Sequence, residues 1–263
     1  MFLLGFVNLL ETAAAITGTG FEASAPASNI ATRVFSQSAR SVDAAAASTI
    51  IDIDHGSPVA TRVLVLTRHN LTSAATVRLR RGTSNGGSEV SDTGAIAAWR
   101  FTPWRYDGGI WDAQVLQAAA TTAPYTRIEI VDEDNPDDFI EIGGAYLCDP
   151  WQPTYDPDLG LKNGHKPLST VPLADDGADW PTRRSTPRTD AFNFSVLTLA
   201  EGDFLHQAEQ FNSITEDVLY LPHAEDPARC QQYGYRGRMT QLDGLLYPQW
   251  RTRSKAFAME QRR

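Results

Sequence analysis

The chain has 263 residues, of which 42% are hydrophobic and 21% charged, the proportions of an ordinary soluble globular protein. Because domains usually run to about 100–150 residues, this length leaves room for two hydrophobic cores. The net charge of −9 at pH 7 argues against nucleic acid as the main partner, since phosphate binding needs a clustered basic surface.

The N-terminal segment Met1–Leu10 is almost entirely apolar. A secretory signal would carry Lys or Arg ahead of the apolar run, but the first basic residue is Arg33. The run is also too short to cross a bilayer as a helix. We therefore predict a buried strand here, no membrane insertion, and a chain that stays in the cytoplasm unless an assembly carries it elsewhere.

Between residues 49 and 147 the apolar residues come in short runs with β periodicity, separated by turn residues. The run Arg62–Thr67 is apolar at consecutive positions, which is typical of a strand covered on both faces. The pattern predicts an all-β fold, with either a β-sandwich or a jelly roll over residues 21–148. The N-terminal strand, within residues 1–20, is a candidate to complete the C-terminal sheet. The expected strands are Thr49–Ile53, Arg62–Thr67, Thr76–Arg81, Tyr125–Asp132 and Phe139–Leu147.

Residues 149–190 are rich in Pro, Gly and Asp and have little apolar periodicity. This composition predicts a linker or an extended loop, and we place the domain boundary there. Residues 191–263 return to β periodicity around one helical segment, Gly202–Ile214. They predict a smaller β-sandwich or barrel domain with one short helix. Its expected strands are Ala191–Leu199, Asp217–Leu221, Tyr233–Leu242 and Trp250–Glu260.

The segment Ala98–Asp112 concentrates aromatic and basic side chains around a Gly-Gly turn. Aromatic rings beside polar groups stack on sugar rings, and they also anchor protein interfaces. A third interpretation is a loop that packs over the sandwich through its own aromatics. Glycan binding, a subunit contact and core packing all stay open. The candidate contact residues are Trp99, Trp104, Arg105, Tyr106 and Trp111.

Catalytic motifs are missing from the sequence. Asp54 and His55, or His69, combine with Ser57 or Ser73 into a triad on paper, but no G-x-S-x-G turn is present. The histidines form neither an H-x-x-x-H nor an H-E-x-x-H pair. We therefore expect a protein that is not an enzyme.

Metal-binding motifs are missing as well. The acidic turn Asp132–Asp138 has the oxygens that calcium prefers but neither the spacing nor the glycine of an EF-hand. Cys148 and Cys230 match no metal-ligand spacing, and they either form one long-range disulfide or stay as two buried thiols. We predict that the protein needs no metal and no cofactor.

Four segments resemble the galactose-binding-like, or discoidin-type, jelly rolls. They are Pro26–Asn29, which holds a Ser-Asn pair, Ile51–Gly56 (IDIDHG), Val63–Leu71 (VLVLTRHNL) and Thr126–Ile130 (TRIEI). In that family a Ser-Asn pair after a proline begins the domain, and an R-hydrophobic-x-I strand lies near its end. The resemblance implies a jelly roll of this type for residues 21–148.

The order of parts also resembles the distal tail or minor tail proteins of siphophages, on Arg68–Asn70, Asp217–Met239 and Arg251–Gln261. In those proteins a terminal β-sandwich forms a ring below the tail tube, and a second domain, often carbohydrate-binding, faces outward. The resemblance implies a structural subunit of a tail tip or baseplate that joins tube to hub. Its location would be the virion tail, and the host cytoplasm during assembly. The alternative is a carbohydrate-binding module of the tail that adsorbs to cell-surface glycan.

The ring contact is expected in the alternating strand Trp250–Glu260, which completes the sheet of its own domain, pairs with a neighbouring chain, or does both. An exposed strand edge invites pairing with another chain, and one patch meeting a different patch around an axis closes a ring. The resemblance implies six copies, to match the tail tube, with three as the fallback for a trimeric hub. The candidate ring-contact residues are Trp250, Arg251, Arg253 and Phe257.

Overall fold

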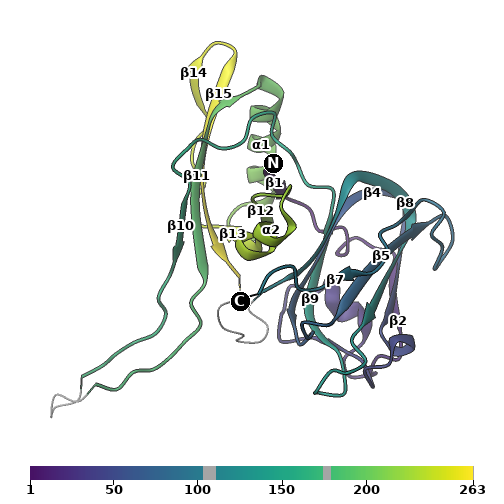
Figure 1. Cartoon of the computed structure of the whole chain (residues 1–263). Helices are drawn as coiled ribbons and strands as arrows, with labels where there is room; N and C mark the ends of the chain where they lie inside the picture. The colour runs from purple at the N-terminus through teal and green to yellow at the C-terminus, as the bar shows by residue number, and fades with distance from the viewer. Residues whose placement is uncertain (103–110, 174–178, 263) are drawn as a thin grey trace. The chain divides into compact units, whose positions relative to one another are not determined.

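The computed structural model describes residues 1–102, 111–173 and 179–262 (Figure 1). The chain forms two compact units. Unit 1 contains Leu3–Gln152 and Leu219–Tyr235, together with Met1, and unit 2 contains Pro153–Val218 and Arg236–Arg263, together with Phe2. Among the described residues, no helix is long and apolar enough to cross a membrane.

Unit 1 is a jelly-roll β-sandwich built around two long antiparallel strands, β4 (Ile50–His69) and β8 (Ala113–Val131). The first half of β4 pairs with the second half of β8, and β2 (Ala15–Thr19) and β5 (Thr76–Gly82) flank this pair. The second half of β4 pairs with the first half of β8 and, on its other side, with β9 (Glu141–Cys148). The same two strands therefore contribute to both layers.

The two layers enclose one hydrophobic core. Ile51 and Ile53 enter it from the first half of β4, and Leu64 and Leu66 enter it from the second half. The inward positions change from odd to even along the strand because its middle is irregular, with register shifts and a φ of 72° at Gly56. Two strands were expected here, and the structure has one bulged strand instead.

The prediction that Arg62–Thr67 is covered on both faces is confirmed. Val63 and Val65 point away from the first core into a second cluster, which includes Leu3, Tyr146 and Leu219. The layer that covers them contains β1 (Leu3–Gly5) paired with β12 (Val218–Leu221), and α2 (Pro227–Tyr233). Residues 219–235, which the sequence analysis assigns to the C-terminal domain, thus belong to unit 1.

Helix α2 begins at an Asp-Pro pair. The side chain of Asp226 accepts hydrogen bonds from the backbone N–H groups of Ala228 and Arg229, at 3.1 and 3.2 Å. Pro227 fills the first helical position, where no N–H is needed. No helix is expected here from the sequence, because seven residues are too few to show a helical periodicity.

The remaining elements of unit 1 are short. Three two-residue strands pair with the edges of longer ones, and two 3₁₀ helices lie in the segment before β4. They are β3 (Ala39–Arg40), β6 (Ser91–Asp92), β7 (Ile96–Ala97), η1 (Ala27–Ala31) and η2 (Ala46–Ser48).

Unit 2 is smaller and has β11 (Arg188–Leu197) paired antiparallel with β15 (Thr252–Gln261) at its centre. Strand β10 (Lys162–His165) pairs with the other side of β11. Strands β13 (Tyr235–Met239) and β14 (Leu246–Gln249) both pair with the other side of β15. The expected all-β class is confirmed.

The core of unit 2 is aromatic. The rings of Phe192 and Phe257 are stacked with centroids 5.3 Å apart, and Phe194 meets Phe257 edge-on at 6.1 Å. Helix α1 (Leu199–Asn212) contacts β15 and lies where Gly202–Ile214 predicts a helix. A capping box between Thr198 and Glu201 starts it.

Part of segment 149–190 is a hairpin rather than a free linker. Beyond β10 and β11 the two sides stay paired, at Lys166 with Pro187 and at Thr170 with Thr182. Figure 1 shows them running side by side away from β10 and β11. We call residues 166–173 and 179–187 the arm. The Pro and polar residues of the arm interrupt the alternation that is typical of strands, so the sequence pattern does not predict this pairing.

Candidate functional site

The aromatic loop Ala98–Asp112 is described only at its two ends. Trp99 is buried, and its indole N–H donates to the carbonyl of Leu71 at 3.1 Å. Half-buried Trp111 meets the ring of Phe101 edge-on at 4.8 Å. Trp104, Arg105 and Tyr106 lie outside the described residues. Trp99 is therefore a core residue and offers no free face to a sugar.

The two ends of this loop are held by one buried amide that the sequence analysis misses. Gln231 of α2 donates to the carbonyls of Ala98 and Asp112, at 2.6 and 2.9 Å, and accepts from the N–H of Arg100. It lies more than a hundred positions from the loop, so no local pattern points to it.

The histidines considered for catalysis have structural contacts. Burial lowers the pKa of His69 from 6.5 to about 4, and its Nδ1 accepts from the N–H of Leu71. Burial also lowers the pKa of His55 to about 4, and its Nε2 lies 3.0 Å from the hydroxyl of Thr126. Both rings are neutral at pH 7 and fill interior space.

The buried carboxylate of the acidic turn Asp132–Asp138 has partners within unit 1. Asp132 accepts hydrogen bonds from Thr72 and from the side-chain amide of Asn135, and the side-chain carbonyl of Asn135 accepts from the N–H of Asp137. Across the described residues, no group of three His, Cys, Asp or Glu side chains is placed to hold a metal ion.

Both cysteines are free and buried in the second cluster of unit 1. Burial raises the pKa of the Cys230 thiol to about 12 and raises that of Cys148 further. Of the two options from the sequence, the structure has the buried thiols.

The ring-contact residues fall into three environments. Trp250 lies in the turn between β14 and β15 and is 92% exposed, and Arg251 beside it is exposed. Phe257 is buried in the core of unit 2. Arg253 is half-buried, with its guanidinium 4.1 Å from the ring centroid of Tyr247.

The expectation that Trp250–Glu260 offers a free strand edge is wrong. Strand β15 is hydrogen-bonded to β11 on one side and to β13 and β14 on the other. Both sides of β15 are covered over most of its length within the unit, which leaves no continuous strand edge for a partner chain. The part of the segment that is exposed is the tip of the β14–β15 hairpin.

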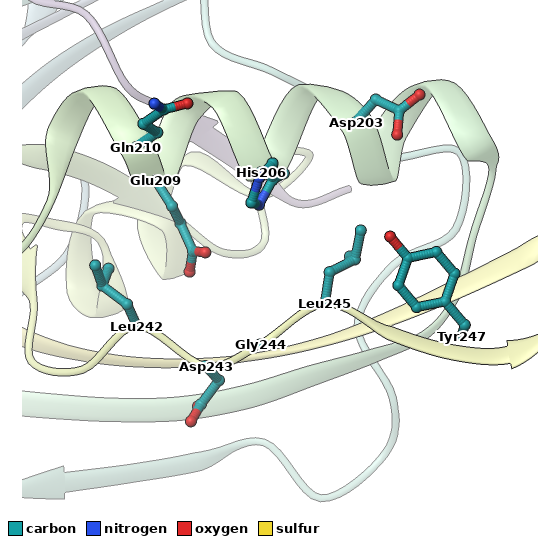
Figure 2. Close-up of a pocket in the computed structure, with 9 residues that line it drawn as sticks. All are labelled: Asp203, His206, Glu209, Gln210, Leu242, Asp243, Gly244, Leu245 and Tyr247. Carbon is teal, nitrogen blue, oxygen red and sulfur yellow. The ribbon is translucent and has the colours of Figure 1, made fainter.

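Beside this hairpin lies a pocket of about 570 Å³, between α1 and the segment Leu242–Tyr247 (Figure 2). Asp203, His206 and Gln210 share one side of the helix because they are spaced by three and four residues. Figure 2 shows Leu245 and Tyr247 pointing up toward α1, and Glu209 pointing down into the space between.

A second pocket, of about 600 Å³, adjoins the first through Tyr247. Its lining is mainly apolar and aromatic, with the guanidinium of Arg253 and the amide of Gln249 as polar groups. The other lining residues are Leu199, Pro248 and Trp250.

Exposed apolar side chains are distributed very unequally. In the described part of unit 1 the large exposed hydrophobic residues are valines only. In unit 2 they include leucines, phenylalanines, tyrosines and tryptophans, at the hairpin tip, on α1 and along the arm. Among them are Leu246, Tyr247, Trp250, Phe204, Phe211, Leu173 and Trp180.

No family model and no curated protein matches this chain. Several solved structures do. A family 32 carbohydrate-binding module from C. perfringens NanJ, in complex with galactose, has a TM-score of 0.41 at 9% identity over 55% of this chain and 98% of that one. The Lectinolysin lectin domain complexed with Lewis B antigen has 0.39 at 11% identity over 54% and 96%.

A chitosan-binding module from a Paenibacillus sp. IK-5 chitosanase/glucanase has a TM-score of 0.37 at 16% identity over 54% of this chain and 97% of that one. These are likenesses to carbohydrate-binding modules. At this level of similarity they establish neither a ligand nor an activity for this chain.

Proposed function

We propose that the protein is a non-enzymatic structural subunit that assembles with other protein chains through unit 2. The observation that carries the proposal is the concentration of exposed leucine and aromatic side chains in that unit. Large exposed apolar patches mark interaction sites, and aromatic anchors supply most of the energy of many interfaces. Trp250, at 92% exposed, is the clearest such anchor.

The biological setting of this proposal is a phage tail tip or baseplate, in the virion tail, with tube and hub proteins as partners. Its support is the sequence resemblance to distal tail proteins. Six copies in a ring remain the favoured stoichiometry, with three as the fallback. Since β15 has no free edge, the contact would be made by side chains of the hairpin tip and the arm.

The proposal is tested with two matched substitutions of exposed apolar residues. Trp250→Ser removes the anchor in unit 2, while Val42→Ser makes a similar change in unit 1, where Val42 is 58% exposed. Light scattering should show a multimer for the wild type and for Val42→Ser, and a smaller species for Trp250→Ser. A wild-type chain that stays monomeric at high concentration and is absent from purified tails would end the proposal.

A second candidate function is carbohydrate binding, the alternative that the sequence analysis leaves open. The observation that favours it is the aromatic pocket, where Trp250 and Tyr247 stand beside Arg253 and Gln249. Aromatic faces with a few hydrogen-bonding groups suit a sugar ring.

Calorimetric titration of dilute, monomeric protein with galactose, Lewis B antigen and chitosan oligomers tests this candidate. We expect at least one sugar to bind. Trp250→Ala should weaken the affinity for that sugar about ten-fold, which is the scale of one lost aromatic contact. Val42→Ala should bind as the wild type does. If no sugar binds, or if Trp250→Ala binds unchanged, the pocket is not a glycan site.

A further inference from the structure

The aromatic pocket at the hairpin tip is lined by a guanidinium that has no acidic partner. Arg253 lies with its guanidinium 4.1 Å from the ring centroid of Tyr247. The one hydrogen bond of this guanidinium to a described residue is donated by Nη1 to the carbonyl of Thr252, at 3.1 Å. No carboxylate of the described residues pairs with Arg253 or with the exposed Arg251. The pocket therefore suits a carboxylate carried among apolar groups.

The outer part of the arm presents such a set of groups. The antiparallel pairing of Leu173 with Asp179 places both side chains on one face of the arm, because directly opposite residues of paired strands point the same way. Strand alternation adds Val171 and Pro181 to that face. All four residues are exposed, and we call them the arm face. Asp179, the one charged residue among them, forms no ion pair with a described residue.

The arm is exposed along its length. Every described residue of the arm except Pro187 is exposed. A two-stranded hairpin by itself is at best marginally stable in water, because it buries little apolar surface. A surface of another chain that covers the arm face would supply this burial.

The arm face and the aromatic pocket lie at opposite ends of unit 2. Strand β11 pairs with β15 from Thr189 and Glu260 at one end to Leu197 and Arg253 at the other. The arm continues from the first end and the β14–β15 hairpin lies at the second (Figure 1). The ten residues of β11 separate the two ends by about 30 Å. An arm that runs away from the pocket in this way reaches the pocket of another copy and not its own.

We propose that the arm face of one copy binds the aromatic pocket of a second copy, with Asp179 paired to Arg253 and Leu173 packed on the ring of Trp250. This contact rests on the assembly through unit 2 proposed above, and it names the two surfaces that meet. Hydrogen bonds between a carboxylate and a guanidinium are strong, and complementary charge makes the contact specific. Because the two surfaces differ and each copy has one of each, the contact repeats head-to-tail.

Exchange of the two charges tests the contact. Asp179→Arg makes both surfaces positive, and Arg253→Asp makes both negative. In light scattering, each variant alone should need a concentration about ten-fold higher, or more, to assemble. An equimolar mixture should assemble as the wild type does, because each arm then meets a pocket of opposite charge. The control Thr182→Arg adds a charge to the opposite face of the arm and should assemble normally.

A second mixture avoids substitution of Arg253, which is half-buried and whose variant must first be shown by circular dichroism to be folded. Trp250→Ser changes an exposed turn residue and disables the pocket, while Asp179→Arg disables the arm. The mixture of these two variants has one working arm and one working pocket. It should therefore give a dimer and nothing larger.

The outcomes separate this contact from assembly through unit 2 in general. If Asp179→Arg assembles as the wild type does, or if both mixtures stay monomeric, the arm contact is overturned and assembly through unit 2 still stands. Assembly that is lost in Trp250→Ser but kept in Asp179→Arg assigns the pocket to another occupant and also overturns the arm contact. A wild-type chain that stays monomeric at high concentration overturns both proposals.

Discussion

At the scale of single residues, burial decides the role of each side chain more than its type does. Trp99, Trp250 and Phe257 were all candidate contact residues, yet Trp99 and Phe257 lie in cores and Trp250 is exposed. Strand alternation correctly predicts an apolar face at Phe257. It cannot show that Phe257 is buried beside Phe192, its cross-strand neighbour from a strand about sixty residues earlier.

The buried histidines make the stability of unit 1 depend on pH. His69 is neutral in the folded state, with its pKa lowered from 6.5 to about 4, and the unfolded chain takes up the proton first. Its contribution is therefore present above pH 6.5 and is lost as the pH falls from 6.5 to 4, by about 3 kcal/mol.

Urea unfolding at pH 7 and at pH 4.5 measures this loss. The wild type should lose stability on acidification, and His69→Gln should lose less, with His55 accounting for part of the remainder. The control His165→Gln changes an exposed ring in unit 2 and should keep the full pH dependence. Equal pH dependence in wild type and His69→Gln would contradict the neutral, buried state of this ring.

At the scale of elements, long strands are predictable and their partners are not. Thr76–Arg81 matches β5 closely, and TIIDI and RVLVLT both lie in β4. The bulge that joins the latter two could not be predicted, because a Gly in the left-handed region also occurs in ordinary turns. The sequence pattern does not predict helix α2 or the arm, because neither has enough apolar residues to show a helical or a strand periodicity.

The packing of β1 against the second cluster gives a prediction for one glycine. A Cβ added at Gly5 would lie 2.7 Å from the Cys148 sulfur and 3.1 Å from Leu219 Cβ, both fixed in the buried cluster. Gly5→Ala should lower the free energy of unfolding by about 1–3 kcal/mol. Gly244→Ala is the control, because its added Cβ meets nothing within 4 Å. Thermal unfolding that ranks the two variants equally would contradict this packing.

At the scale of the whole molecule, the chain passes from unit 1 into unit 2 at Pro153 and returns to unit 1 at Leu219. Residues 219–235 read as ordinary β and turn sequence, and nothing in them specifies which unit they join. Their place is decided by burial of Leu219, Leu221 and Cys230 against β4 and β9. The candidate site depends on the same kind of information: the pocket needs α1 and residues 242–247 together, some thirty positions apart.

Hydrogen–deuterium exchange of the wild-type chain, in dilute and in concentrated solution, tests assembly through unit 2 most directly. We expect concentration to slow exchange in peptides from the arm and from residues 242–253, where Leu246, Tyr247 and Trp250 are exposed. Unit 1 peptides should exchange at the same rate in both conditions. Exchange that is independent of concentration everywhere, or protection confined to unit 1, would contradict the proposed assembly.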